Sequence, residues 1–316
     1  MFAARGIAVS FSVFVMVYLA LSVAVCLTWR RVWLHAQAYP IRGAADLLFG
    51  FRMFPLACAA AITAAFTVPS FLLLEPRAID EPIGAIPLLL GLIGSALGVF
   101  GLVNACFAWV RASLTLSDWT RDAESVTTQS SVPLIRIARS VPAMTAAGIV
   151  RPRVLLSTST EFLLTPNEMQ TAVNHELAHI RRRDNLKKLL FRFVAFPGMS
   201  ELEDAWLEAT EMAADDAAVS STGEALDLAA ALIKLSRLNP AAPPVDLTAA
   251  LVHTPVHLMN ARVERLIAWS EARLVPSRRY SSWYAVSAAA ATLAMFAFTY
   301  SQLLLRVHTA TEWLVR

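Results

Sequence analysis

Charged residues are scarce in this chain. Asp, Glu, Lys and Arg make up 16% of its 316 residues, hydrophobic residues make up 57%, and the mean hydropathy is +0.54. A soluble domain carries about 25% charged residues, so this composition excludes an ordinary soluble protein and indicates membrane spans.

Cysteine is also scarce. Cys26, Cys58 and Cys106 lie inside apolar runs without CxxC spacing, which argues against a disulfide framework and against a cysteine-based zinc site.

Four apolar runs are each long enough to cross a hydrocarbon core of about 30 Å. They span residues 6–29, 53–74, 84–110 and 283–305. The first run ends in Arg30-Arg31 without an obvious cleavage site, so we expect a retained span rather than a signal peptide. The expected organisation is therefore three transmembrane helices in residues 1–110, a folded domain in 111–282, and in 283–316 a fourth transmembrane helix with a short tail.

The distribution of basic residues predicts the orientation in the membrane. The loop between the first two spans is basic and contains one acid, Asp46, whereas the next loop is net acidic. Basic residues also flank the long segment between the third and fourth spans. The positive-inside rule then places the first loop and residues 111–282 in the cytoplasm, and the N-terminus and the C-terminal tail outside. The basic residues used here are Arg30, Arg31, Arg42, Arg52, Arg111, Arg278 and Arg279.

Histidine is rare, with 6 in the chain, yet two of them flank a glutamate at helical spacing. His175 and His179 are four residues apart, so on a helix both imidazoles project from one face and can share a metal ion. Glu176 lies about 100° round the helix, where its carboxylate can take a proton from a water molecule on that ion. This H-E-x-x-H pattern is the signature of zinc peptidases. The competing interpretation is a helix with two surface histidines.

Local signals place this motif on a helix next to a small sheet. Thr165-Pro166-Asn167-Glu168 is a capping box with proline at the first helical position, which predicts a helix from Pro166 to about Arg183. Residues 134–138 and 153–157 are typical of strands. A third strand is expected at 144–148, ending in a turn at Gly148. The polar stretch 117–131 predicts a short helix and a loop.

A zinc site needs a third protein ligand. Ser200-Glu201-Leu202-Glu203 predicts a second capping box, and the helix that follows it holds several acids. We expect Glu211 to be the ligand, because Asp215 lies four residues further on the same face. An aspartate there can accept the outer N–H of a zinc-binding histidine. Glu208 is the rival ligand. Further helices are expected at 224–238 and 257–273.

These segments resemble the BlaR/MecR-type membrane metallopeptidases, the sensor-transducers of beta-lactam resistance. The resemblance implies His175, His179 and Glu211 as Zn²⁺ ligands, Glu176 as the general base, and Asp215 behind a histidine. It also implies a gluzincin-like fold in which a substrate peptide pairs with a sheet edge, for which 144–148 is the candidate strand. The matching segments are Gly148-x-x-Arg151-Pro152-Arg153-Val154, the run from His175 to Asp184, and the run from Glu211 to Val219.

The expected fold class is an α-rich membrane protein, with four transmembrane helices and a cytoplasmic α+β gluzincin-like domain between spans three and four. The expected function is cleavage of a protein or peptide substrate at the cytoplasmic side of the bacterial inner membrane, in regulated proteolysis. A transcriptional repressor is one candidate substrate. The alternatives are an HtpX-type quality-control peptidase, whose zinc core is similar, a non-catalytic zinc-bearing scaffold, and an intramembrane peptidase, which the polar flanks of the motif disfavour.

Partners and the remaining site residues are less defined by the sequence. The transducers carry a penicillin-binding domain after the last span, whereas 11 residues follow Leu305 here, so we expect any signal to come from a partner, the membrane or the outer loops. The lipid bilayer is an expected partner. Direct nucleic-acid binding is not, because the basic run 181–183 is short and lacks interleaved aromatics. His253, His257 and Arg262 are candidate oxyanion-stabilising groups, and the substrate-binding residues are not located.

Overall fold

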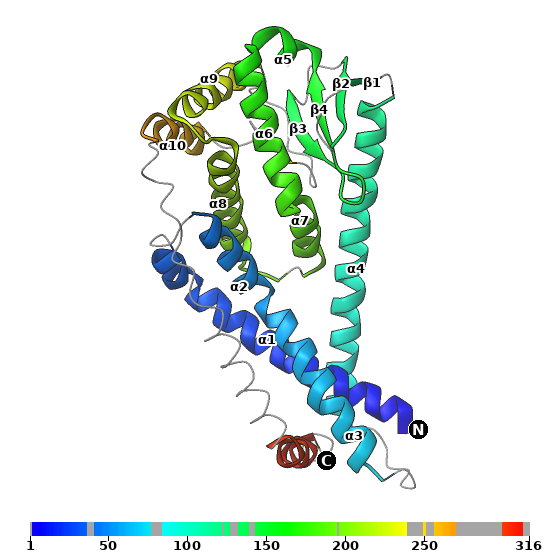
Figure 1. The fold of residues 1–316 in the computed structure, drawn as a ribbon. Coiled ribbons are helices and arrows are strands. Elements are labelled where there is room, and N and C mark those ends of the chain that lie inside the picture. The colour runs from blue at the N-terminus through cyan, green and yellow to red at the C-terminus, as the bar shows by residue number, and fades with distance from the viewer. Residues whose placement is uncertain are drawn as a thin grey trace. The chain divides into compact units, whose positions relative to one another are not determined.

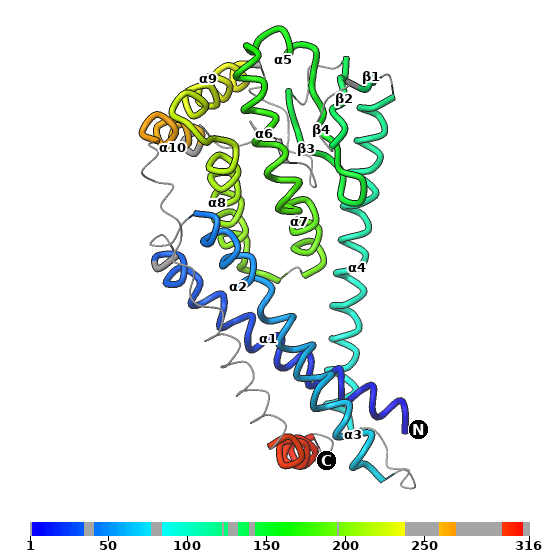
Figure 2. Tube along the Cα trace, in the orientation of Figure 1, coloured from blue at the N-terminus to red at the C-terminus, as the bar shows by residue number. Residues whose placement is uncertain are grey.

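The chain forms two compact units, and it is rich in helix (Figure 1). The first unit comprises residues 1–32, 50–101 and 276–316, and the second comprises 33–49 and 102–275. Figure 2 traces the order of the elements along the chain. The computed structural model describes residues 2–36, 41–76, 84–121, 123–126, 132–138, 143–194, 196–238, 249–250, 256–269 and 299–311.

Among the residues that the structure describes, three helical stretches are long and apolar enough to cross a membrane: Phe2–Leu34, Ile41–Leu74 and Ala85–Trp119. The first belongs to α1 (Phe2–Ala36) and the third is α4 (Ala85–Trp119); the second joins α2 (Ile41–Ile62), a π-helical turn (Thr63–Thr67) and α3 (Val68–Leu74). The apolar runs expected at 6–29 and 53–74 lie inside such stretches, and the run at 84–110 begins one residue before α4. Of the fourth expected span, 283–305, the structure describes 299–305, which are helical.

Two contacts in the first unit show how its helices meet. Pro69 has no N–H to give to the carbonyl of Ala65, and the Tyr300 hydroxyl donates to that oxygen at 2.7 Å. In a membrane-spanning helix such a hydrogen-bond donor stabilises the carbonyl group, because lipid offers no donor.

The second contact joins α4 to α1. A Cβ at Gly94 on α4 would lie 2.6 Å from Val15, so glycine permits the close approach of α1 there. Among the described residues, nothing lies within 4 Å of a Cβ at Gly98, so this glycine is not part of such a close contact.

The second unit contains a five-stranded mixed sheet with the order β1-β2-β4-β3-β5. Strands β2, β3 and β4 confirm the three expected from sequence. β2 and β4 run parallel, and the remaining neighbours are antiparallel. The short helix expected in 117–131 is wrong for the described part of this range, because α4 continues to Trp119 and a strand follows it, and residues 127–131 lie outside the described chain. The strands are β1 (Glu124–Val126), β2 (Leu134–Ile137), β3 (Met144–Ala147), β4 (Arg153–Ser157) and β5 (Ala249–Ala250).

Each face of the sheet packs against helices. Val154 and Leu156 of β4 belong to the main core beside α6 and α9, whereas Leu155 faces Leu116 and Trp119 of α4. This alternation is what the two-residue period of a strand produces. Figure 1 shows the sheet between α6 and the C-terminal part of α4. Burial on both faces explains why β4 is apolar almost throughout.

Six further helices complete the second unit: α5 (Thr158–Leu163), α6 (Pro166–Arg182), α7 (Asp184–Phe193), α8 (Ser200–Ala218), α9 (Thr222–Leu238) and α10 (Val256–Ile267). Helix α8 begins where expected, but the second capping box is wrong. Ser200 is already helical, and Met199 occupies the cap position without a side-chain hydrogen bond. Helix α10 ends at Ile267, earlier than the expected 273, and residues 270–273 lie outside the described chain.

The first capping box is confirmed and fixes the start of α6. The Thr165 hydroxyl accepts the N–H of Glu168, and the Glu168 carboxylate accepts the N–H of Thr165 at 2.8 Å. Lys234 on α9 also pairs with Glu168 at 2.7 Å, which ties the two helices together. Both contacts lower the pKa of Glu168 against the opposing effect of burial.

Replacing Thr165 with alanine should destabilise the second unit by about 1 kcal/mol, because it leaves an N–H at the helix start without its acceptor. The expected result is a fall of about 2–4 °C in the thermal unfolding midpoint, followed by circular dichroism in detergent. Thr165→Ser retains the hydroxyl and serves as the control. Equal midpoints for the alanine and serine variants would contradict a role for this cap.

Candidate metal centre

Helix α6 presents the motif residues to the interior of the second unit. His175 and Glu176 are fully buried, and His179 is 3% exposed. The four-residue spacing stacks the two imidazoles on one face of the helix, with ring centroids 4.8 Å apart. The interpretation of the motif as a helix with two surface histidines is therefore wrong.

A carboxylate from α8 joins the two imidazoles. The Nε2 atoms of His175 and His179 are 3.1 Å apart, and the Glu211 carboxylate lies 3.5 Å from the first and 3.6 Å from the second. One ligand-type atom from each of the three residues lies within 4.8 Å of the others. Glu208, the rival from sequence, is not a member of this group. The three residues can thus hold one metal ion.

The outer nitrogen of each histidine faces an aspartate. His175 Nδ1 lies 2.9 Å from Asp215, and His179 Nδ1 lies 2.8 Å from Asp184. A carboxylate accepts hydrogen bonds, so a proton on each Nδ1 suits this arrangement, and an imidazole in its neutral form then turns the lone pair of Nε2 toward Glu211. Two lone pairs and a carboxylate oxygen at these distances repel one another unless a proton or a metal cation lies among them. Ligand atoms around a tetrahedral ion with bonds of about 2.0–2.1 Å are about 3.3 Å apart, so the three groups fit such an ion.

A single residue links α6 to the helix that carries Asp184. Arg183 has φ 55° and ψ 40°, a left-handed conformation that ends α6 and starts α7 at the next residue. The sharp turn brings Asp184 back beside His179. Asp46, in the first turns of α2, pairs with Arg182 at 3.0 Å and with Lys187 at 3.3 Å, which fixes the turn from outside. All these residues belong to the second unit.

Arg262 on α10 binds two acidic residues of α8, Asp215 and Glu211. Its side chain is 1% exposed, donates to Asp215 through two nitrogens at 2.7 and 2.6 Å, and lies 3.0 Å from Glu211. Burial alone would raise the pKa of Asp215, but Arg262 outweighs burial and holds that pKa well below its usual range. Burial likewise opposes ionisation of Glu211, yet His179 and Arg262 lower its pKa to about 2. Both carboxylates are therefore ionised.

The contacts of Arg262 with Asp215 and Glu211 decide whether Arg262 can stabilise an oxyanion. The Arg262 guanidinium is committed to Asp215 and Glu211, so it does not fit that role in this arrangement. His253 lies outside the described residues, as does the side chain of His257.

Glu176 contacts the sheet rather than the three convergent residues. One carboxylate oxygen accepts the backbone N–H of Ala146 on β3 at 2.5 Å, and the other has no hydrogen-bond partner among the residues that the structure describes. Burial raises the pKa of Glu176, while His175 and His179 act in the opposite direction. The expected substrate edge at β3 is not open: Ala146 pairs with Ala249 and Thr145 with Ala250 of β5.

Comparison with known families agrees with this geometry. The model of the BlaR1 peptidase M56 family matches residues 78–266, more than half of the chain, including α4, the whole metal centre and Arg262. The chain belongs to the BlaR1 peptidase M56 family. The resemblance to BlaR/MecR-type peptidases is thereby confirmed. A search of curated proteins finds no match to the sequence.

Two residues of this M56 peptidase centre were not assigned their roles from sequence. Asp184 belongs to the matching run after H-E-x-x-H, but its position behind His179 depends on the left-handed turn at Arg183. An acid soon after the second histidine is a weak signal for it. For Arg262, the sequence suggested only a role in stabilising an oxyanion. Its contact with Asp215 joins residues 47 positions apart, which no local pattern reveals.

Protons and metal ions should compete for His175 in this M56 peptidase. Burial lowers the pKa of His175, but Asp215 and Glu211 outweigh it and raise the pKa to about 9. A metal-binding imidazole must lose its added proton, so apparent metal affinity should rise about tenfold per pH unit toward pH 9. Competition against a chromophoric chelator from pH 6 to 8.5, corrected for the chelator's own protonation, measures this slope. A pH-independent affinity would contradict the competition.

Proposed function

We propose that this M56 peptidase is an integral-membrane, zinc-dependent endopeptidase. The observation that carries the proposal is the convergence of His175, His179 and Glu211 beside a buried Glu176, with each histidine held by its own aspartate. Two imidazoles and one carboxylate form a ligand set that suits Zn²⁺. Three protein ligands leave a fourth position for water or substrate, the arrangement typical of catalytic rather than structural zinc.

Zinc bound there acts as a Lewis acid, which polarises a carbonyl group and lowers the pKa of water. Glu176 handles the protons. Its carboxylate accepts one proton as the water oxygen forms a bond to the scissile carbonyl carbon, and it returns that proton to the amide nitrogen as the C–N bond breaks. The raised pKa suits this exchange, because a more basic carboxylate takes up a proton more readily. The products are a carboxylic acid and an amine, and no other reactant is needed.

A substrate in an extended conformation would enter along β3. Ala146 on this strand already contacts Glu176, so a peptide paired there lies close to the base. The short strand β5 occupies that edge at Thr145 and Ala146, and a substrate strand must therefore replace it. Backbone pairing would give affinity, while side-chain pockets would give specificity.

The cellular role proposed is regulated proteolysis on the cytoplasmic side of the bacterial inner membrane, within a four-span, gluzincin-like architecture. Basic flanks support this orientation, and the family supports a role of the BlaR/MecR type. A cytoplasmic repressor is the proposed class of substrate. Thiol labelling of single cysteines placed in the exposed surface of α9 tests the orientation in intact cells. Labelling by a membrane-impermeant reagent added outside would contradict it.

Metal removal tests the proposed chemistry. The purified full chain is incubated with a denatured protein mixture, and new N-termini are identified by mass spectrometry. A strong chelator should abolish cleavage, and stoichiometric Zn²⁺ should restore it, whereas Mg²⁺ should not, because imidazole ligands disfavour Mg²⁺. Cleavage that survives complete metal removal would contradict the proposal. A chain that binds zinc but cuts nothing, alone or in cells, would favour the scaffold alternative.

A further inference from the structure

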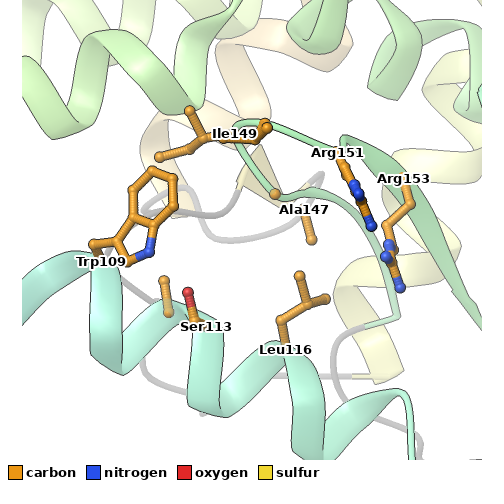
Figure 3. A pocket seen from close by; sticks show the side chains of 10 residues that line it. Trp109, Ser113, Leu116, Ala147, Ile149, Arg151 and Arg153 are labelled. Atoms are coloured by element: carbon orange, nitrogen blue, oxygen red, sulfur yellow. The ribbon is translucent and has the colours of Figure 1, made fainter.

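A cavity of about 260 Å³ lies on the opposite side of the sheet from α6 (Figure 3). Its walls are one face of α4 and the turn between β3 and β4, all within the second unit. Trp109, Ser113 and Leu116 recur at helical spacing on the α4 side. The cavity is slightly smaller than the roughly 300–1,000 Å³ typical of pockets for drug-sized ligands, so it suits a headgroup rather than a whole lipid.

Two arginines line the other side of this cavity. Arg151 is exposed and Arg153 is half-buried, and Figure 3 shows both on one side with Trp109 across from them. No acidic side chain in the described part of the chain pairs with either of them, in contrast to Arg136, Arg182 and Arg262 in the same unit. Two like charges on one wall repel unless an anion lies between them. Guanidinium groups bind phosphate with paired hydrogen bonds, so phosphate is the anion that they suit best.

The turn that leads from β3 to these arginines has a fixed shape. Gly148 has φ 89°, and a Cβ there would lie 2.7 Å from the carbonyl oxygen of Arg151. Asn185 on α7 donates to the carbonyl of Gly148 at 3.4 Å and to that of Ala146 at 3.1 Å. The backbone below the arginines is therefore held before any ligand arrives, which lowers the entropy lost on binding.

The rest of the lining indicates an amphiphile rather than a free ion. Leu116, Ala147 and Ile149 place apolar surface beside the two guanidinium groups. Trp109 lies two residues before Arg111, the first charged residue after an uncharged run of α4 that begins at Ala85. Tryptophan followed by arginine at the end of an apolar span is typical of the headgroup layer. Lipid phosphates lie at this depth.

We propose that this cavity binds the phosphate headgroup of an anionic phospholipid, with Arg151 and Arg153 contacting the phosphate and Trp109, Leu116 and Ile149 contacting the glycerol and the first acyl carbons. The site is separate from the metal ligands, and the proposal does not depend on peptidase activity. The two sites do share a strand. Residues Ala147 and Gly148 border the cavity, and Ala146 contacts Glu176, so a bound lipid stiffens the backbone beside the proposed base.

Native mass spectrometry and thermal unfolding of the full chain test this proposal. Nanodiscs of phosphatidylcholine alone are compared with nanodiscs containing phosphatidylglycerol, and a third sample receives inorganic phosphate in phosphatidylcholine. We expect phosphatidylglycerol to be retained and to raise the unfolding midpoint. The double variant Arg151→Gln/Arg153→Gln should weaken retention about tenfold or more, because each lost guanidinium–phosphate contact is charge-assisted.

The control variant Arg181→Gln/Arg237→Gln removes the same charge from exposed positions outside the cavity and should retain the lipid as the wild type does. Unfolding midpoints in phosphatidylcholine alone show whether each variant is folded. Equal retention by the cavity variant and the control variant would overturn the proposal. Stabilisation by inorganic phosphate without preference for phosphatidylglycerol would also overturn it, in favour of a free-phosphate site.

Discussion

Replacing Glu176 with glutamine should abolish peptide-bond cleavage and leave metal binding unchanged. Glutamine has the shape of glutamate and can still accept the N–H of Ala146, but its amide cannot take a proton from water. General-base catalysis typically contributes about 10²–10⁴-fold to the rate, so kcat should fall by at least about a hundredfold. Because Glu176 is not among the three convergent ligand residues, the variant should still bind one zinc ion per chain.

The measurement combines zinc content by atomic emission with cleavage by the purified protein. In cells, comparison of N-terminal peptides between the wild type and Glu176→Gln should reveal a protein whose cleavage disappears in the variant. Glu208→Gln is the matched control: it removes a carboxylate from α8 that does not join the ligand group and should leave cleavage largely intact. A Glu176→Gln variant that cuts at the wild-type rate would show that another group handles the proton.

Replacing Arg262 with methionine should severely destabilise the metal centre. The change leaves the buried carboxylate of Asp215 without its two-nitrogen contact and Glu211 without a neighbouring cation. Removing one member of a buried ion pair costs about 3–5 kcal/mol. Zinc affinity should fall about 10–100-fold, as is typical when a residue that orients a metal ligand is lost. Thermal unfolding and zinc competition measure the two effects separately.

Arg265 on the same helix is a natural control. It pairs with Asp216 at 2.6 Å, but both side chains are about a quarter exposed. Arg265→Met should therefore cost at most about 1 kcal/mol and leave zinc affinity unchanged. The double variant Arg262→Met/Asp215→Asn tests the cause, because neutralising Asp215 removes the orphaned charge and should recover part of the lost stability. If Arg262→Met and Arg265→Met were equally mild, the buried ion pair would have no special role.

Local sequence patterns correctly predicted those elements whose geometry depends on residues a few positions apart in the sequence. The start of α6 follows from Thr165 and Glu168, which are three residues apart and whose side chains bond to each other's backbone. The same pattern at Ser200 and Glu203 failed, because the backbone at Met199 and Ser200 does not take the extended conformation that a capping residue needs. Strand β1 was missed because three residues, Glu124–Val126, carry no visible alternation.

Contacts between segments that are far apart in the sequence could not be predicted from local patterns. The histidines and Glu211 could be proposed together because a known class of peptidases has the same order of ligands. The pairing of Arg262 with Asp215 and the position of β5 against β3 instead depend on how α10 and residues 249–250 return to the core. A buried arginine and a partly exposed one on α10 look alike in sequence, since Arg262 and Arg265 both lie three or four residues from apolar neighbours.

The turn at Arg183 implies an order of events as the protein folds. His179 and Asp184 are five residues apart, so their hydrogen bond can form as soon as α6 and α7 meet at that turn. His175 depends on Asp215, 40 positions away along the chain, and Asp215 depends in turn on Arg262. Contacts close in sequence form sooner than distant ones. In a nascent chain, the imidazole of His179 would therefore be oriented well before that of His175. High-affinity metal binding would begin only after α10, which carries Arg262, has docked.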